Sequence, residues 1–509
     1  MPMITATELT DISRTVSAAK PLESSSVKNA APDNQASEAS YSALLYREKL
    51  LAISIASLAT FVSPMSASAY YPGIEAVASD LHVSKDMINL TMTTFKVFQG
   101  IAPLVTGSLS DQRGRRPTLI ISLILYIGTN IAIALQPTFA WLLVLRSFQS
   151  VFSSTIAIVG PAIAADVASG AERGKYMAYT VLGATVGPAL GPAIGGVLIQ
   201  FFGWRSTFWA LAILALTILI AVVGLLPETC RAVVGNGSVP PPSWNKPVSQ
   251  LVFQTPHPVS PRYDTLTGFK AKPGPWCTLK LMRRRETAAT IFFSAVIYAG
   301  YISITTTLPF ELGKHYHYSP LQIGLCYLAY GGGSFAARWT AGPLTDWNFR
   351  RLARRLGFGI LESKESDLVD FPLEKARLQI ALPFVYAACM FVVTYGWVLD
   401  YEVTIAVSLV MLFCSAHALS GITSTLTTLI VDLHPGQPAT ASAAANFFRC
   451  MLGAGTSAAG VPLINRTGVG WAGSILAFIF AASSPLLWTV YIFGDKWRKS
   501  RRRSTEERS

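Results

Sequence analysis

The sequence predicts an all-α membrane protein with twelve transmembrane helices in two six-helix bundles. Of its 509 residues, 51% are hydrophobic and 14% are charged, whereas a soluble domain carries about 25% charged residues. The apolar residues form continuous runs, such as 51–69 and 119–135, which as helices can cross a hydrocarbon core of about 30 Å. A β-barrel would alternate polar and apolar residues instead. These observations indicate a polytopic helical protein.

The apolar runs fall into two sets of six, separated by a long polar segment. We expect the spans at residues 50–71, 87–109, 117–135, 139–165, 176–201 and 206–226, and then at 288–312, 320–344, 378–399, 404–431, 440–464 and 472–493. The segment between the sets is too polar and too rich in proline to span. The chain therefore divides into a disordered N-terminal tail (1–47), an N-terminal bundle (48–226), an irregular linker (227–287), a C-terminal bundle (288–494) with a polar insert (346–376), and a basic tail (495–509).

Lysine and arginine residues lie beside the ends of the apolar runs, on alternate connections. The basic connections hold Arg113, Arg115 and Arg116; Arg173 and Lys175; Arg283, Arg284 and Arg285; Arg350, Arg351, Arg354 and Arg355; and the tail from Lys496 to Arg503. The positive-inside rule therefore predicts that both termini are cytoplasmic. We expect the plasma membrane, with the vacuolar membrane as the alternative. Because these charges form no patch on a polar domain, orientation in a lipid bilayer explains the net charge of +13 better than nucleic acid does.

The two halves carry the same pattern at the same place. Gly107 and Asp111 end the second span, Gly342 and Asp346 end the eighth, and arginines follow both. Such a duplication is expected of transporters built from two related bundles that rock about a central site.

The stretch from Gly107 to Arg116 resembles the signature between spans two and three of the major facilitator superfamily. Its glycine would let two helices approach closely, and Arg115 would pair with a carboxylate of another helix. The resemblance implies that Asp111 contacts the start of the eleventh span near Thr440 in one conformation. An ordinary basic loop is the alternative. We assign to this conformational latch Gly107, Asp111, Arg115, Arg116, Asp166 (the expected partner of Arg115) and Asp346.

The fifth span has glycines at intervals of four, which lie along one face of a helix. They are Gly183, Gly187, Gly191 and Gly195, with Pro188 and Pro192 between them and Gly196 following. This pattern resembles the fifth-span signature of major facilitator antiporters, which would assign Gly187, Gly191, Pro192, Gly195 and Gly196 to an antiporter helix. A small-residue helix interface without a role in coupling is the alternative.

Two cations stand well inside apolar spans, where an exposed charge is costly. Arg146, with Gln149 one turn later, lies in a context that resembles the fourth-span signature of the superfamily, whose arginine is associated with proton coupling. We expect Arg146 to face the interior cavity, with pairing to backbone carbonyls as the alternative. Lys96 lies near the middle of the second span. It could attract an anionic substrate or pair with a neighbouring polar group.

The second half and the first span add further resemblance. Gly331-Gly332-Gly333-Ser334, the run from Asp346 to Arg350, and the run from Ala439 to Asn446 look like fungal twelve-span drug:proton antiporters of the quinidine-resistance type. Asn446 and Arg449 share a helical face, which we place on the cavity side, with packing as the alternative. The residues that we assign to the substrate or proton pathway are Lys96, Arg146, Gln149, Asn446, Arg449 and Tyr70.

Other classes of function find less support. The six cysteines have no metal-site spacing, no GxxxxGK[ST] loop for ATP occurs, and we find no nucleophile, base or metal constellation of an enzyme. A membrane receptor would be expected to have longer signalling tails. We therefore expect neither an enzyme nor a cofactor or metal.

These features predict a monomeric exporter of small organic compounds, such as drugs, toxins or a secondary metabolite, that moves protons inward by alternating access. An exporter of an organic acid or another anionic metabolite is the alternative, because Lys96, Arg146 and Arg449 lie in apolar spans. The sequence does not identify the substrate. It also does not identify the residue that carries the proton, for which the candidates are Asp166, Glu311, Asp432, a lysine or a histidine such as His417.

Overall fold

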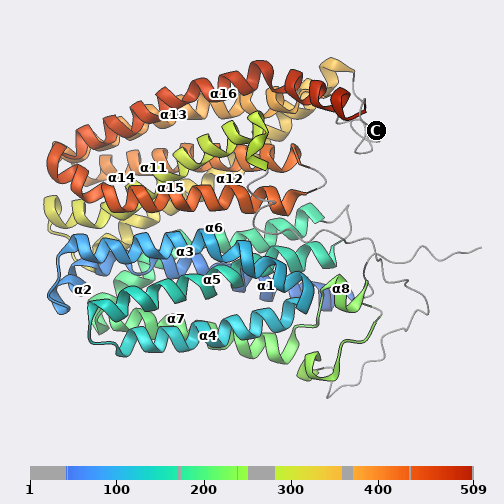
Figure 1. Ribbon diagram of the computed structural model, residues 1–509. Helices are drawn as coiled ribbons and strands as arrows, with labels where there is room; N and C mark the ends of the chain where they lie inside the picture. Colours follow the sequence, from blue (N-terminus) through green and yellow to red (C-terminus); the bar gives the residue numbers. More distant parts are fainter. Residues whose placement is uncertain are drawn as a thin grey trace, which may run out of the picture. The chain divides into compact units, whose positions relative to one another are not determined.

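A computed structural model describes residues 42, 44–168, 173–237, 239–249, 281–357, 371–434 and 437–506. The N-terminal bundle consists of α1 (Tyr46–Ser68), η1 (Tyr71–Gly73), α2 (Ile74–Asp80), α3 (Lys85–Arg113), α4 (Arg115–Leu135), α5 (Phe139–Val167), α6 (Arg173–Phe202) and α7 (Arg205–Leu225). Three short elements follow: α8 (Arg231–Val234), η2 (Ser243–Asn245) and η3 (Leu281–Arg283). The C-terminal bundle consists of α11 (Arg285–Tyr316), α12 (Pro320–Leu356), α13 (Leu373–Asp400), α14 (Ile405–Asp432), α15 (Pro438–Thr467) and α16 (Val469–Glu506) (Figure 1).

Each of the twelve predicted spans coincides with one long helix. By length and composition, ten helical stretches among the described residues are apolar enough to cross a membrane. The other two long helices, α3 and α12, are more polar, and α3 carries Lys96. Residues 1–41, 250–280 and 358–370, which hold most of the predicted tail, half of the predicted linker and the middle of the predicted insert, lie outside the described part of the chain.

Two helices continue beyond the predicted spans. α12 continues ten residues past Asp346 to Leu356, and α16 continues through the predicted basic tail to Glu506. Both extensions are rich in arginine, which is too polar for a membrane span but is a good helix former. α12 ends at Gly357, whose φ of +75° suits a glycine at a helix C-terminus.

The two bundles use the same helix pairings. In the N-terminal bundle α1 packs on α5 and α6, α3 packs on α5, and α4 packs on α5 and α7. In the C-terminal bundle α11 packs on α14 and α15, α12 packs on α14, and α13 packs on α14 and α16. The duplication seen in the sequence therefore extends to the packing.

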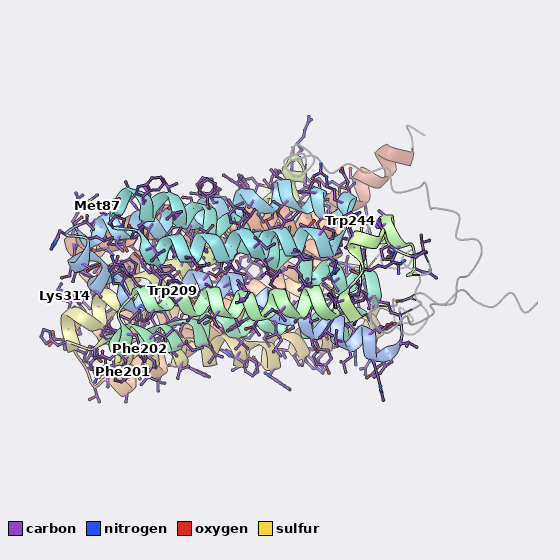
Figure 2. The ribbon with its side chains drawn as sticks, turned by 90° about the horizontal axis from the view of Figure 1, so that it is seen from below. Met87, Phe201, Phe202, Trp209, Trp244 and Lys314 are labelled. Atoms are coloured by element: carbon purple, nitrogen blue, oxygen red, sulfur yellow. The ribbon has the colours of Figure 1, made fainter. Side chains whose placement is uncertain are left out.

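Large apolar side chains cover the outer surfaces of the helices. Ile213, Ile220 and Phe478 are each more than 60% exposed. Figure 2 labels two more, Phe201 and Phe202, at the end of α6. A soluble monomer rarely exposes extended apolar surface, so these faces fit the hydrocarbon of a bilayer.

The helices have two chemically different ends. We name the end with the α3–α4 turn at Gly114, α8 and η3 the basic end, because it carries the arginine clusters; it lies to the right in Figure 1. The opposite end holds η1, α2, the α6–α7 turn at Gly203 and the α13–α14 turn at Glu402.

The bundles meet through two helix pairs, α6 with α12 and α3 with α15. A Cβ on Gly196 of α6 would lie 2.5 Å from the carbonyl oxygen of Pro320, at the start of α12. Also near the opposite end, Lys85 lies 5.5 Å from the ring centroid of Phe310 in α11. The described ion pairs at both ends join two residues of the same bundle. Toward the opposite end the bundles are therefore joined by close packing, of α6 on α12 and of Lys85 on Phe310.

Candidate functional site

Arg146 is completely buried in the middle of α5. Its guanidinium carbon lies 4.6 Å from the ring centroid of Tyr70, 4.7 Å from that of Phe95 and 5.9 Å from that of Phe208. Aromatic faces attract a cation electrostatically, and more strongly when water is excluded. Three aromatic side chains of the N-terminal bundle thus surround the charge.

Hydrogen bonds tie the same arginine to three helices. Its Nη1 donates to the carbonyl oxygen of Ser66 at 3.1 Å and to Oε1 of Gln149 at 2.7 Å. Gln149 Nε2 donates to Asn130 Oδ1 at 2.7 Å, and Asn130 Nδ2 donates to the carbonyl oxygen of Tyr126 at 2.7 Å. These bonds join α1, α4 and α5 within one bundle.

The expectation that Arg146 faces an interior cavity is therefore wrong for this conformation. Arg146, Gln149 and Tyr70 lie inside the N-terminal bundle and do not line the junction of the two bundles. The alternative, pairing with a backbone carbonyl, is what the geometry shows. A part in proton coupling stays a prediction.

Lys96 lies where the two bundles meet. It is 5% exposed, and its Nζ donates to Gln99 Oε1 at 2.9 Å on its own helix and to the Tyr298 hydroxyl at 3.5 Å on α11. Gln99 Nε2 in turn donates to Ser63 Oγ of α1 at 3.4 Å. No carboxylate lies within ion-pair distance of Lys96 in the part of the chain that the structure describes.

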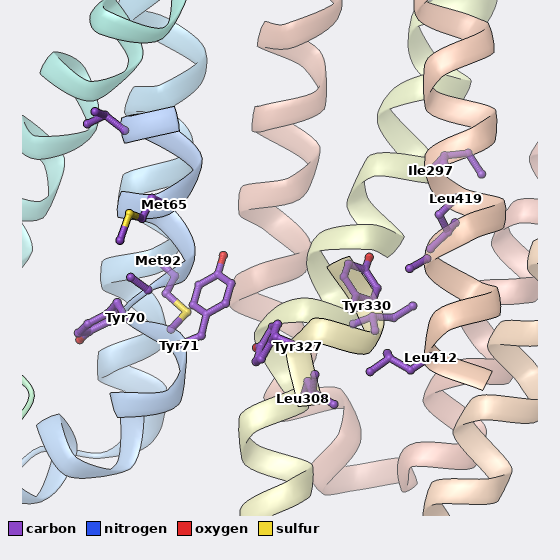
Figure 3. Packing of buried hydrophobic residues seen from close by; sticks show 14 of the residues in the cluster. Met65, Tyr70, Tyr71, Met92, Ile297, Leu308, Tyr327, Tyr330, Leu412 and Leu419 are labelled. Carbon is purple, nitrogen blue, oxygen red and sulfur yellow. The ribbon is translucent and has the colours of Figure 1, made fainter. Parts of the chain in front are cut away.

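A cluster of tyrosines extends from Lys96 along this junction. Tyr298 and Tyr301 of α11 stack with centroids 5.8 Å apart, and Tyr330 of α12 lies 5.1 Å from Tyr301. Nearer the opposite end, Tyr71 of η1 lies 6.1 Å from Tyr327 of α12, and Figure 3 shows Tyr71 on the side of its helix that faces Tyr327 and Tyr330 of α12. The junction thus presents aromatic faces and hydroxyls beside one cation.

Asn446 and Arg449 lie on α15, and both are half-buried. Arg449 Nη1 donates to Thr427 Oγ1 of α14 at 3.4 Å, and its Nε donates to the carbonyl oxygen of Ala445 at 3.2 Å. Cys450, which hydrogen-bonds to Asn446 at 3.8 Å, packs against Gly100 of α3. This face of α15 therefore borders the N-terminal bundle, which is expected of residues that line a pathway between the two bundles.

The glycines of α6 serve two different interfaces. A Cβ on any of four positions would collide with α1 or the residue after it; these are Gly183, Gly187, Gly191 and Gly195. Pro192 and Gly196 instead lie against the first turns of α12, because a Cβ on Gly324 would collide with the carbonyl oxygen of Pro192. α6 therefore packs closely within its own bundle and against the other bundle, as small residues in membrane helices permit.

The structure brings together Arg115 and Asp166. Arg115 Nε donates to Asp166 Oδ2 at 2.9 Å, and its Nη1 donates to Asp111 Oδ1 and to Ser110 Oγ. Asp111 is 54% exposed at its side chain and makes no hydrogen bond to Thr440, so the expected contact with α15 is absent from this conformation of the described residues. A latch that forms only when the basic end closes stays a prediction.

The reason given for Gly107 is wrong. A Cβ there would lie 3.7 Å from Ile158 Cδ1, which is an ordinary contact, so Gly107 provides no close helix approach. The close approach on α3 is at Gly100, whose Cβ would lie 2.8 Å from the Cβ of Cys450 in the other bundle.

A buried carboxylate fixes the α3–α4 turn to the start of the linker. Glu228 is 4% exposed, and its oxygens accept hydrogen bonds of 2.8 to 3.3 Å from the backbone N–H groups of Arg115, Arg116, Thr229 and Cys230 and from the side-chain amide of Asn245. Arg116 donates to the carbonyl oxygen of Val223 at 3.0 Å. The first part of the linker therefore packs on the bundle and is not a free tether.

Cys230 adds a further hydrogen bond between the start of the linker and α3. Its thiol donates to the carbonyl oxygen of Asp111 at 3.3 Å. Burial raises the pKa of the Cys230 thiol, so it stays neutral and can donate at neutral pH.

The C-terminal bundle repeats the ion-pair arrangement with a residue that the sequence interpretation missed. Arg377 of α13 donates to Asp432 of α14 at 3.1 Å and to Asp346 of α12 at 3.3 Å. These helices correspond to α4, α5 and α3, which carry Arg115, Asp166 and Asp111. The duplicated aspartate could have drawn attention to Arg377, which directly precedes the predicted span 378–399 as Arg115 and Arg116 precede the span 117–135.

The tyrosine cluster and Glu228 were also missed. Tyr298 and Tyr301, and likewise Tyr327 and Tyr330, stand three residues apart, a spacing that places each pair on one helical face. Among the described residues, no group of three or more His, Cys, Asp or Glu side chains is arranged to hold a metal ion.

Comparison with known proteins agrees with this architecture. Residues 56–458 match the family model of the Major Facilitator Superfamily. The MFS-type transporter clz19 of Cochliobolus lunatus is 39% identical over 460 residues, which cover 90% of this chain and 87% of that protein. Citrate exporter 1 of Aspergillus niger is 30% identical over 470 residues, covering 89% and 88%.

A solved structure supports the fold independently. The xylose transporter XylE from E. coli, in a partially occluded inward-open conformation, superimposes with a TM-score of 0.59 at 13% identity, covering 87% of this chain and 99% of that one. By the family model and the relatives above, the chain belongs to the Major Facilitator Superfamily and is a multi-pass membrane transporter and not an enzyme.

Proposed function

We propose that the protein is a proton-coupled antiporter that exports small organic compounds by alternating access. The observation that carries this proposal is the junction of the bundles, where Lys96, Gln99 and Tyr298 bring polar groups of both bundles together, near the middle of the predicted second span. A substrate bound there would contact both bundles, so its binding would depend on their relative tilt.

The direction of export follows from the charge at the two ends. With the basic end in the cytoplasm by the positive-inside rule, the close contacts between the bundles lie toward the outside, as is expected of a conformation that loads from the cytoplasm. The plasma membrane is the proposed location, and protons entering from outside would drive the return step.

An anionic metabolite is the second candidate substrate. Lys96 and Arg449 have no carboxylate partner among the described residues. Lys96 borders the junction, and Arg449 is next to Cys450, which packs against α3. A buried cation without a counter-ion is costly, and an anionic ligand would relieve that cost. The relative named a citrate exporter is in keeping with this class.

Transport into proteoliposomes with an acidic interior tests the proposal. The probes are rhodamine 6G, a permanent organic cation, and radiolabelled citrate. Accumulation of either probe that depends on the pH gradient supports antiport, and accumulation of citrate selects the anionic class. Transport that ignores the gradient for both probes would show that the protein is not a proton antiporter.

Two matched lysine variants sharpen this test. Lys96→Gln removes the cation at the junction, whereas Lys499→Gln removes one that is 43% exposed and paired with Asp495 on its own helix. A pathway role for Lys96 predicts that only the first variant loses transport. Equal transport by both variants would remove Lys96 from the pathway.

A further inference from the structure

Lys96 of α3 and Arg449 of α15 are two cations on helices that pack against each other across the junction. Within the described chain, Lys96 donates to a glutamine side chain and a tyrosine hydroxyl, and Arg449 donates to a threonine hydroxyl and a backbone carbonyl. None of the ion pairs among the described residues includes either cation. Because charges held away from water are costly without a counter-ion, this arrangement favours an anionic ligand.

The helices that meet here carry no carboxylate near these cations. α15, over residues 438–467, contains no aspartate or glutamate. The acidic residues of α3 are Asp86 in its first turn and Asp111 in its last turn. Those of α11 are Glu286 in its first turn and Glu311 toward its other end. The middle of the three helices is therefore cationic, and a bound anion can supply the missing negative charge.

The two cations lie on either side of one close contact between the bundles. Gly100 lies one turn after Lys96 on α3. A Cβ on Gly100 would lie 2.8 Å from the Cβ of Cys450, the residue that follows Arg449 on α15. Both cations are within electrostatic range of the Cys450 thiol. A single small ligand can therefore reach both charges.

Tyr298 of α11 adjoins both cations and gives the site an aromatic wall. Its hydroxyl accepts the hydrogen bond from Lys96 at 3.5 Å, and Arg449 acts on the same side chain electrostatically. A Cβ on Gly453, one turn after Arg449, would lie 3.2 Å from the Tyr298 ring. The ring of Tyr301 stacks on that of Tyr298 with centroids 5.8 Å apart. Aromatic faces next to the charges favour a ligand with an apolar skeleton.

From this geometry we propose that the junction binds an organic dianion, namely a dicarboxylate with one carboxylate at Lys96 and the other at Arg449. The inference rests on the proposed function, in which the junction is the substrate site, and adds the number and placement of the substrate's charges. A monoanion neutralises one cation and leaves the other unpaired. Because the two cations belong to different bundles, a dicarboxylate also links the bundles, and its affinity depends on their relative tilt.

Thermal unfolding of the purified full chain in detergent tests this inference without transport. The probes are the α,ω-dicarboxylates from succinate to suberate and the monoamide of each acid, which has the same skeleton and one charge fewer. Both carboxyl groups of a dicarboxylate are ionised at neutral pH. A ligand that binds the folded protein raises the unfolding temperature as its concentration rises, and this dependence gives the Kd. Sodium chloride at matched concentrations serves as the simple-anion control.

We expect at least one dicarboxylate to bind about tenfold more tightly than its monoamide, because it gains a second charge-assisted hydrogen bond. Lys96→Gln and Arg449→Gln should each remove this preference, since either variant leaves one cation. Arg449→Lys, which keeps the charge, should retain the preference. Arg205→Gln, which removes an exposed arginine paired with Asp80, should leave it unchanged.

Three results would overturn the proposal. The first, which needs no variant, is equal affinity of the unchanged protein for every dicarboxylate and its monoamide, or no binding of either. The second is a preference that persists in folded Lys96→Gln or Arg449→Gln. The third is an equal rise in unfolding temperature with sodium chloride. Transport that ignores the pH gradient in the vesicle experiment would instead remove antiport and leave the dianion preference in place.

Discussion

Arg146 and Lys96 are both cations buried in the N-terminal bundle, yet their surroundings differ. All contacts of Arg146 that are described above come from helices of its own bundle. Lys96 hydrogen-bonds to Gln99 on its own helix and to Tyr298 on the other bundle. When the bundles tilt, the contacts of Arg146 can move together, whereas the contact between Lys96 and Tyr298 must change.

This difference indicates that Arg146 stabilises the N-terminal bundle as a rigid unit, whereas the contacts of Lys96 change with the conformation of the protein. Energetic coupling between sites needs an element with two arrangements. Lys96 lies at such an element and Arg146 does not. The following variants test that division, from the largest expected effect to the smallest.

Replacing Arg146 should chiefly destabilise the protein. Arg146→Met leaves Gln149 Oε1 and the Ser66 carbonyl without their buried donor, which should cost about 3 kcal/mol. Thermal unfolding in detergent measures the loss. The control is Arg205→Met, because Arg205 forms an exposed ion pair with Asp80 at 2.6 Å, which is worth at most about 1 kcal/mol. Equal losses in the two variants would contradict the structural role.

Removing the ion pairs of the basic end should have the next largest effect on stability. Arg115→Gln removes the ion-pair partner of Asp166, whose side chain is 12% exposed and which keeps only Arg231 nearby, and Arg377→Gln removes that of Asp432, which is 26% exposed. We expect a loss of about 2 kcal/mol for Arg115→Gln and less for Arg377→Gln, since the more exposed carboxylate is better solvated. Unfolding curves of the two variants give the order, and the reverse order would refute this reasoning.

Replacing Lys96 should change transport more than stability. Lys96→Gln keeps a donor but removes the charge, so it should lower transport of an anionic probe about tenfold, which corresponds to 1.4 kcal/mol. Its unfolding temperature should stay close to that of the unchanged protein or rise, because a buried unpaired charge is removed. A strongly destabilised Lys96→Gln with normal specific transport would reverse the division between the two cations.

Substitutions at two glycines of α3 should have the smallest effects. They again compare a contact with the other bundle, at Gly100, and a contact within the same bundle, at Gly107. Gly100→Ala places a Cβ 2.8 Å from Cys450 across the junction, and a cost of about 1 kcal/mol would slow transport roughly fivefold. Gly107→Ala makes only an ordinary contact with Ile158, so its effect should stay within about 0.5 kcal/mol. Transport rates per folded molecule measure both. A larger loss of transport in Gly107→Ala than in Gly100→Ala would contradict the assignment of the close helix contact to Gly100.

The sequence by itself determined the twelve helices, the duplication and the pairing of Arg115 with Asp166. Length and hydropathy are local properties, and a helix in lipid must satisfy its backbone groups internally. The helices of 21 residues or more therefore appear where the apolar runs predict them. The spacing of Gly183, Gly187, Gly191 and Gly195 likewise defined one face of α6, although not its neighbour.

Only the tertiary structure decided which neighbour each face meets. It placed Arg146 inside one bundle and Lys96 at the junction, assigned the close approach to Gly100 and not to Gly107, and brought Glu311 beside His315. A face buried within its own bundle and a face buried against the other bundle have the same residue pattern. Their difference arises from the packing of several helices at once, which no single segment of the sequence contains.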